Sequence, residues 1–198
     1  YNGGTFHGTL SAWSAGGAMI TAQTYFDGTG IQNAALAVGG TTNPKACVEE
    51  YNGETWSVGG ALSIGRVDNY GIFGTQNAAG MAGGAPGPVM ADTELYNGYV
   101  WSAGADINTA RRYNQGAGTQ TAGITMGGYI NASSALTEEY NGSTWSEVGD
   151  LINARNSFSA DGTQNAALAF AGHDSPADPR LCTEEYNGTS WATANALN

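Results

Sequence analysis

The chain has 198 residues, of which 31 are glycine, and its formal net charge is −11. Such an excess of carboxylates repels nucleic-acid phosphates and anionic lipid, so neither is expected as a partner. No run of residues approaches the ~20 apolar positions that cross a bilayer, which argues against membrane insertion. The length suits a single domain with a substantial core, spanning residues 1–198.

Three short blocks recur along the whole chain. Tyr-Asn-Gly returns at intervals of 44 to 46 residues, and a tryptophan follows five positions after each of these tyrosines. The tyrosine and tryptophan positions are Tyr51, Tyr96, Tyr140 and Tyr186, then Trp56, Trp101, Trp145 and Trp191, with Trp13 one repeat earlier. A G-x-Q-[NT]-A block and a pair of small residues recur in the same units. The repeats cover approximately residues 13–55, 56–100, 101–144 and 145–191, with residues 1–12 as an extra strand or latch.

Each unit is expected to contain four short strands. In the first unit, these are residues 21–26, the apolar run 34–38, residues 48–51, and a strand that carries the tryptophan. The second strand is nearly all apolar, as is typical of a strand buried on both faces. Asn-Gly after the tyrosine predicts a two-residue hairpin turn. Four strands in a repeat of this length predict an all-β protein, a β-propeller of four four-stranded blades. A segment of a larger propeller is the alternative.

The order of these blocks resembles the kelch repeat. In the first unit it is Leu-Ala-Val-Gly-Gly at 36–40, then Tyr51, then Trp56. The tyrosine-to-tryptophan spacing is shorter than in the usual kelch motif, and Ala171 replaces the first glycine of the fourth unit. The sequence pattern T-E-E-Y-N-G-x-x-W-S, together with G-T-Q-N-A-A-L-A, is also similar to kelch-like arrays of marine phage and environmental bacterial surface proteins. That resemblance implies an extracellular or virion-surface location.

Residues that stay the same in every unit are expected to be structural. The repeated tyrosines and tryptophans are interpreted as wedges between neighbouring blades. Three equivalent arginines, Arg66, Arg111 and Arg155, are replaced by Gln23 in the first unit. A pair of glutamates precedes most of the tyrosines, and alternation along a strand turns one inward and the other to water. The inward carboxylate needs donors, which the arginine or backbone N–H groups could supply. A catalytic carboxylate pair is disfavoured, because an active site is normally assembled once.

Residues that support metal or nucleophilic chemistry are scarce. The two histidines, His7 and His173, are too few for a conventional metal site, and no nucleophile elbow, phosphate loop or zinc spacing occurs. We therefore expect no enzyme activity, no cofactor and no metal. Cys47 and Cys182 occupy equivalent positions in different units, which a propeller holds too far apart for a disulfide, so both thiols are expected to be free.

The segments that vary between units are the candidates for function. The connections after the paired small residues, 41–46, 85–91, 129–135 and 173–181, are expected to share one face, and loops of this kind carry binding sites. Candidate ligand-binding residues are Lys45, Tyr129, Asn131, His173, Asp174, Asp178 and Arg180. Residues expected on the innermost strands, which suit either sugar binding or a filled core, are Tyr25, Phe26, Asp68, Asn69, Tyr70, Tyr113, Asn114 and Phe158.

The leading hypothesis is a non-catalytic binding module on a virion or cell surface. It would recognise a glycan or a protein receptor through variable loops on one propeller face. The alternative is a structural or decorative domain of a phage tail or capsid, with no ligand of its own, that packs against neighbouring virion subunits. An enzyme is the third and least favoured hypothesis.

Overall fold

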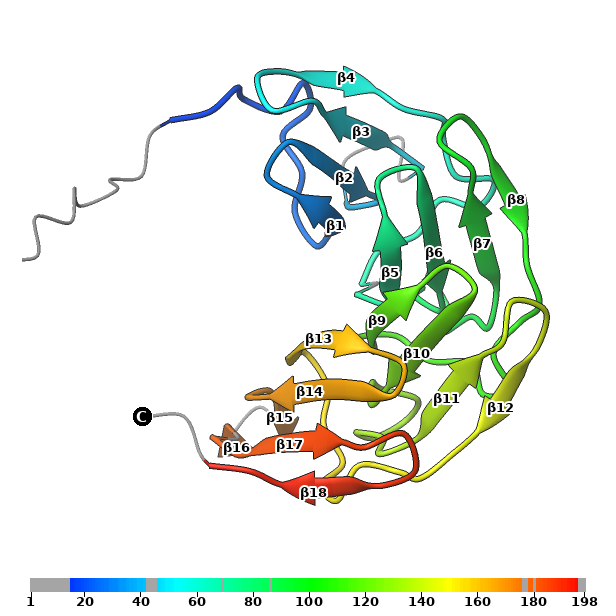
Figure 1. The fold of residues 1–198 in the computed structure, drawn as a ribbon, viewed down its shortest axis with the longest axis vertical. Coiled ribbons are helices and arrows are strands. Elements are labelled where there is room, and N and C mark those ends of the chain that lie inside the picture. Colours follow the sequence, from blue (N-terminus) through cyan, green and yellow to red (C-terminus); the bar gives the residue numbers. More distant parts are fainter. Residues whose placement is uncertain are drawn as a thin grey trace, which may run out of the picture.

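The computed structural model describes residues 15–41, 46–68, 70–85, 87–175, 178–179 and 181–195. These residues form four antiparallel four-stranded sheets that stand radially around a common axis, as a four-bladed β-propeller (Figure 1). The prediction of an all-β propeller with four blades is confirmed. None of the described segments forms a helix that could span a lipid bilayer.

Each sheet runs outward from the axis in chain order. Sheet 1 consists of β1 (Asp27–Ile31), β2 (Ala34–Val38), β3 (Val48–Tyr51) and β4 (Trp56–Val58). Sheet 2 consists of β5 (Ile72–Thr75), β6 (Ala78–Ala82), β7 (Thr93–Tyr96) and β8 (Trp101–Ala103). Sheet 3 consists of β9 (Gln115–Thr119), β10 (Ala122–Met126), β11 (Thr137–Tyr140) and β12 (Trp145–Glu147). Sheet 4 consists of β13 (Ser159–Thr163), β14 (Ala166–Phe170), β17 (Thr183–Tyr186) and β18 (Trp191–Thr193). A small hairpin of β15 (His173–Ser175) and β16 (Asp178–Pro179) lies between β14 and β17.

The innermost strands begin later in the chain than the sequence analysis expected. The first strand was placed at residues 21–26, but β1 starts at Asp27. Tyr25, Tyr113 and Ser157 adopt φ values of 56°, 57° and 51°, which are incompatible with an extended strand. Most residues assigned to the inner strands therefore lie in the linkers just before them: Tyr25, Phe26, Asp68, Tyr70, Tyr113, Asn114 and Phe158. Asn69, assigned with them, is outside the described residues.

The turn between the third and fourth strands is also longer than expected. Tyr51 pairs with Trp56, which leaves residues 52–55 in the turn rather than two residues. The Asn52 side-chain oxygen accepts hydrogen bonds from the N–H groups of Glu54 and Thr55, at 2.9 and 2.8 Å. This side-chain cap stabilises a four-residue turn, with Gly53 at a φ of 96°.

The core is divided among the contacts between neighbouring sheets. One apolar cluster joins sheets 1 and 2, a second joins sheets 2 and 3, and a third joins sheets 3 and 4. In each, a tyrosine and a tryptophan of the later sheet pack against the earlier one; the Tyr96 and Trp101 rings, for example, stack with centroids 4.9 Å apart. Burial of such large rings makes these interfaces the main source of hydrophobic stabilisation. Trp13 lies outside the described residues.

A buried arginine–glutamate pair anchors the linker that enters each of sheets 2, 3 and 4. Arg66 lies 2.5 Å from Glu94, Arg111 lies 3.0 Å from Glu138, and Arg155 pairs with Glu184. The same carboxylates accept backbone N–H groups of the linker, as Glu94 does from Ser63 at 2.7 Å. In sheet 1, where Gln23 stands at the arginine position, Glu49 accepts the N–H groups of residues 20 and 21. The inward glutamates are therefore structural.

In two units, the second residue of the Glu-Glu pair accepts a hydrogen bond from the neighbouring sheet. Glu50 accepts the hydroxyl of Tyr96, and Glu139 accepts the hydroxyl of Tyr186 at 2.9 Å, each from the following sheet. The expectation of a simply solvated carboxylate was therefore wrong in these two units. The two cysteines are free, as predicted, and the Cys182 sulfur accepts a hydrogen bond from Arg155.

The four sheets form an arc with an opening between its ends (Figure 1). The inner strand β1 packs on β5, β5 packs on β9, and β9 packs on β13. No contact of similar extent joins β1 to β13 in the described part of the chain. The segment 1–12, expected as an extra strand or latch, lies outside the described residues.

Candidate functional site

One end of the sheets gathers the variable segments of the chain. Asp27, at the start of β1, lies opposite Val38, at the end of β2. The linkers that enter the inner strands and the connections that leave the second strands therefore meet at this end, which we call the loop face. The four-residue turns after Tyr51 and its equivalents lie at the opposite end.

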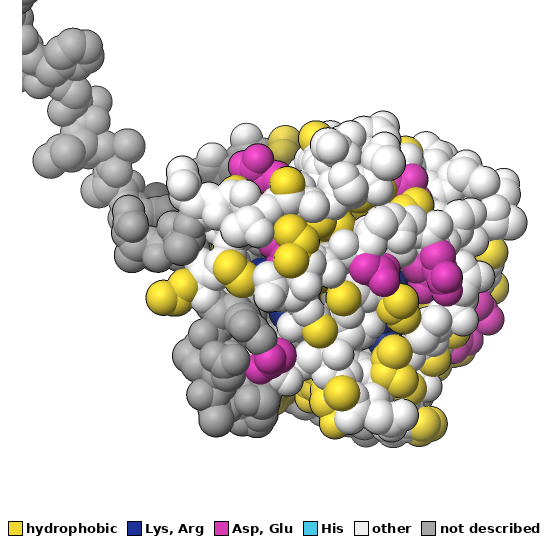
Figure 2. Space-filling view, turned by 90° about the horizontal axis from the view of Figure 1, so that it is seen from below, with side chains coloured by type: hydrophobic (Ala, Val, Ile, Leu, Met, Phe, Trp, Pro, Cys, Tyr) yellow, Lys and Arg dark blue, Asp and Glu magenta, His cyan; other side chains and the backbone are white. Residues whose placement is uncertain are grey.

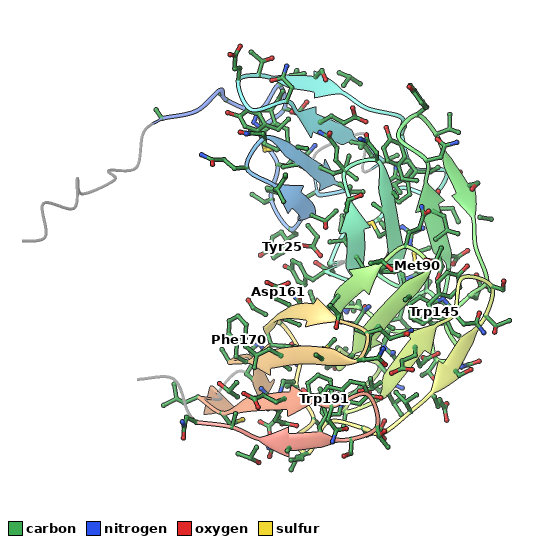
Figure 3. The ribbon with its side chains drawn as sticks, viewed as in Figure 1. Tyr25, Met90, Trp145, Asp161, Phe170 and Trp191 are labelled. Carbon is green, nitrogen blue, oxygen red and sulfur yellow. The ribbon has the colours of Figure 1, made fainter. Side chains whose placement is uncertain are left out.

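A cavity of about 510 Å³ follows the axis between the four inner strands. Asp27 and Asp161 lie on its wall, and Tyr25, from the linker before β1, and Asp161, from β13, extend toward the axis (Figure 3). A second recess of about 280 Å³ lies at the loop-face end of these strands. Its lining residues are Asp27, Tyr70, Gln115, Ser157, Phe158 and Ser159.

Beside this recess, five residues from three segments form what we call the tyrosine cluster: Asp68, Tyr70, Arg112, Tyr113 and Tyr129. The Tyr70 and Tyr113 rings stack with centroids 6.2 Å apart and planes inclined by 24°. The guanidinium carbon of Arg112 lies 4.9 Å from the Tyr113 centroid and 5.5 Å from the Tyr129 centroid. Asp68 accepts hydrogen bonds from Arg112 at 3.2 Å and from the Tyr113 hydroxyl at 2.9 Å. The cluster is thus pre-organised, and its members remain partly exposed.

The local electrostatics keep several groups protonated near neutral pH. Burial raises the pKa of Asp27 to about 7, although N–H groups of Gly28 and Ile72 donate to its carboxylate and lower it. Burial, followed by the nearby carboxylates of Asp68 and Asp27, raises the pKa of Tyr70. Burial and the hydrogen bond to Asp68 raise the pKa of Tyr113. The Tyr70 hydroxyl therefore stays protonated, as does the Tyr113 hydroxyl that donates to Asp68, and Asp27 can both donate and accept.

The structure brings only some of the predicted ligand-binding residues together. Tyr129 belongs to the tyrosine cluster, and Asn131 is exposed on the same connection. His173 pairs through its backbone with Asn156, and the carbonyl of Asp174 accepts a hydrogen bond from the Ser133 hydroxyl at 2.6 Å. The connections 129–135 and 173–181 are therefore in contact. Asp178 is described only as part of β16, and Lys45 and Arg180 are outside the described residues.

Sequence reasoning missed two residues of this site. Arg112 follows the structural Arg111, and the equivalent positions hold Thr24, Val67 and Asn156. Asp27 stands where the other units have Gly71, Gln115 and Ser159. In both cases, the sequence signal was a charged residue at a position where the other three units have uncharged residues.

Metal ligands do not gather in the part of the chain that the structure describes: no group of three or more histidine, cysteine, aspartate or glutamate side chains there could hold an ion. The side of the molecule seen in Figure 2 carries its apolar side chains in separate small groups on a largely polar surface. No protein-family model matches the chain, and a comparison with curated proteins found no similar sequence.

Proposed function

We propose that this chain is a non-catalytic binding module that recognises a neutral glycan through the tyrosine cluster and the recess beside it. The observation that carries the proposal is the stacked Tyr70–Tyr113 pair, held by Arg112 and Asp68 at the edge of a recess of about 280 Å³. Partly exposed rings beside convergent polar groups are the usual composition of a sugar site.

The charge of the site favours neutral sugars among glycans. Asp27 and Asp68 place carboxyl groups beside the rings, where they suit hydroxyl hydrogens as acceptors. Arg112 is already paired with Asp68, and the whole chain carries a net charge of −11. Sialylated or uronic-acid glycans would meet repulsion at such a surface.

A binding role is favoured over catalysis because the repeated carboxylates have structural partners. The inward glutamates are engaged by arginines and linker N–H groups in the framework. The resemblance of the repeats to kelch units, and to kelch-like arrays of marine phage and environmental bacteria, supports a virion or cell surface as the location. A protein receptor on that surface is the other ligand class that the loop face suits.

A neutral-glycan array tests the proposal directly. Wild-type protein should bind a subset of neutral glycans, and Tyr113→Ala should weaken that binding about tenfold, because one stacking ring is lost. Tyr99→Ala is the matched control: Tyr99 is 82% exposed and lies in a turn at the opposite end of the sheets. Equal binding by wild type and Tyr113→Ala, or no binding by wild type, would contradict the proposal. Hydrolysis of the bound glycan would contradict its non-catalytic part.

The second candidate function is a structural or decorative domain of a phage tail or capsid. It is favoured by the apolar side chains of sheets 1 and 4 that stay partly exposed, Trp56, Leu168 and Phe170, since an assembly would cover them. It predicts no glycan binding and association through sheet faces.

A further inference from the structure

One backbone feature recurs at the loop face of all four units. The second residue after the arginine position of each linker has a φ between 51° and 57°, in the left-handed region. These four residues, which we call the left-handed quartet, are Tyr25, Asp68, Tyr113 and Ser157. None of them is glycine, although the left-handed conformation is unfavourable for a residue with a Cβ atom. The chain therefore accepts the same backbone strain in every unit.

Elsewhere the framework places glycine where a positive φ is needed. The paired small residues after the second strand are an example, since Gly39 and Gly40 have φ values of 78° and 113°. Outside the left-handed quartet, Ala171 is the one described residue other than glycine with a positive φ. The quartet positions thus keep a side chain where glycine would relieve the strain. Strain that persists in this way marks candidates for a functional role.

The framework imposes the strained conformation. The residue before each quartet position is tied by backbone hydrogen bonds to the connection that follows the second strand. The tied pairs are Thr24 with Thr41, Val67 with Ala85, Arg112 with Tyr129, and Asn156 with His173, at distances of 2.6 to 3.2 Å. What differs between the units is the side chain that this common backbone displays: two tyrosines, an aspartate and a serine.

Backbone hydrogen bonds also join successive members of the quartet. The N–H of Tyr113 donates to the carbonyl of Asp68 at 2.8 Å, and the N–H of Ser157 donates to the carbonyl of Tyr113 at 3.3 Å. The quartet therefore follows the inner ends of the linkers around the axis. Asp68 and Tyr113 belong to the tyrosine cluster, and Ser157 lines the recess of about 280 Å³ beside it.

Tyr25 brings a further aromatic side chain to the same recess. It is 57% exposed and extends toward the axis, two residues before Asp27, which lines the recess (Figure 3). Tyr25 also contributes to the raised pKa of Tyr70, after burial and the carboxylates of Asp68 and Asp27. Two aromatic platforms, the Tyr70–Tyr113 stack and Tyr25, therefore lie about one recess.

We propose that the left-handed quartet determines which glycan the loop face accepts, with Tyr25 as a second stacking platform. The inference rests on the proposed glycan-binding function and makes it more specific: the ligand is an oligosaccharide of two or more neutral sugar units. One unit stacks on the Tyr70–Tyr113 pair and the next unit stacks on Tyr25. Because the platforms come from different linkers, one sugar ring does not lie flat on both. The Ser157 hydroxyl donates to Asn156, which leaves its oxygen to accept a sugar hydroxyl.

The test uses glycine variants of the full chain, because glycine removes the displayed side chain and relieves the backbone strain together. Tyr25→Gly and Ser157→Gly are the two variants. Tyr99→Gly is the matched control, since it removes an exposed tyrosine at the opposite end of the sheets. Thermal melting measures stability. Calorimetric titration measures affinity for two probes, the best-binding neutral oligosaccharide of a glycan array and the monosaccharide at its end.

Wild type should bind the oligosaccharide at least tenfold more tightly than the monosaccharide. Tyr25→Gly should remove this difference, because the second stacking contact is lost, while Tyr25→Phe should keep it. Ser157→Gly should weaken oligosaccharide binding about fivefold, as expected for loss of one hydrogen bond. Tyr25→Gly should nevertheless melt at or above the wild-type temperature, whereas Tyr99→Gly should melt below it and bind both probes like wild type.

Three outcomes would overturn the inference. Equal affinity of wild type for the two probes, or unchanged oligosaccharide affinity in Tyr25→Gly, would do so while leaving the proposed function intact, provided that Tyr113→Ala still weakens binding. A larger loss of melting temperature in Tyr25→Gly than in Tyr99→Gly would assign Tyr25 to the framework. Failure of wild type to bind any neutral glycan would overturn the inference and the proposed function together.

Discussion

Two consecutive arginines show how the framework and the loop face differ. Arg111 is fully buried and lies 3.0 Å from Glu138 at the base of sheet 3. The next residue, Arg112, has a side chain that is 32% exposed, and it covers the rings of Tyr113 and Tyr129. The linker that enters sheet 3 thus carries a structural residue, Arg111, directly before a residue of the candidate site, Arg112. Stability and binding should therefore be separable by mutation.

The largest expected effect is on stability, from removal of the buried cation. Arg111→Met leaves the Glu138 carboxylate buried with only backbone donors, which should lower the free energy of unfolding by about 3–5 kcal/mol. Urea denaturation measures this change, with Arg112→Met as the matched control. A loss no greater than that of the control would show that the buried pair does not support the framework.

A smaller effect on stability is expected from loss of a glutamine that joins two neighbouring sheets. Gln120→Ala removes two hydrogen bonds between sheets 2 and 3 and should cost about 1–3 kcal/mol of unfolding free energy. Gln32→Ala, the same change at the exposed equivalent position of sheet 1, should leave the free energy of unfolding unchanged. Urea denaturation of both variants at low protein concentration measures the two changes. Equal losses of unfolding free energy would show that the Gln120 contacts do not stabilise the interface between sheets 2 and 3.

The pH dependence of stability should report on Asp27. Its pKa is raised by burial from 3.8 to about 7, so the folded state holds a proton that the unfolded state has released. Stability should therefore fall as the pH rises from about 4 to about 7, by an amount on the order of 1 kcal/mol once solvent screening is included. Asp27→Asn should abolish this slope in thermal melts across that range. If Asp27→Asn keeps the wild-type slope, the pH dependence of stability comes from other titrating groups.

The smallest effect on stability is expected at the loop face itself. Arg112→Met removes a partly exposed ion pair and should cost less than about 1 kcal/mol of unfolding free energy. It should nevertheless weaken glycan binding, because Tyr113 and Tyr129 lose the cation that positions them. Calorimetric titration with the best-binding neutral glycan measures the change. Unchanged affinity would place the sugar elsewhere on the molecule.

Most of the framework could be predicted from the sequence because each element is repeated four times. The apolar second strands were placed within their observed bounds, and alternation correctly turned one glutamate toward the arginine. The start of β1 was missed because the positive φ of Tyr25 has no signal in residue type. The extended turn depends on the Asn52 side chain, which competes with the hairpin that Asn-Gly usually forms.

The candidate site was harder to predict because it combines separate units. Asp68, Arg112 and Tyr129 come from two linkers and one connection, and only the radial packing of sheets brings them together. Comparison of the repeats marked such positions as variable but gave no reason to group them. Tyr129 was selected from the sequence and lies on the loop face, whereas Arg112 was passed over beside its structural neighbour Arg111.

The central claim is that the loop face binds a neutral glycan while the repeated framework holds it in place. Backbone amide NMR spectra recorded during titration with the best-binding array glycan test it most directly. The account predicts shift changes at Asp68, Tyr70, Arg112, Tyr113 and Tyr129, with unchanged signals in the turn at residues 52–55. Changes confined to that turn and its equivalents, with the tyrosine cluster unaffected, would contradict it.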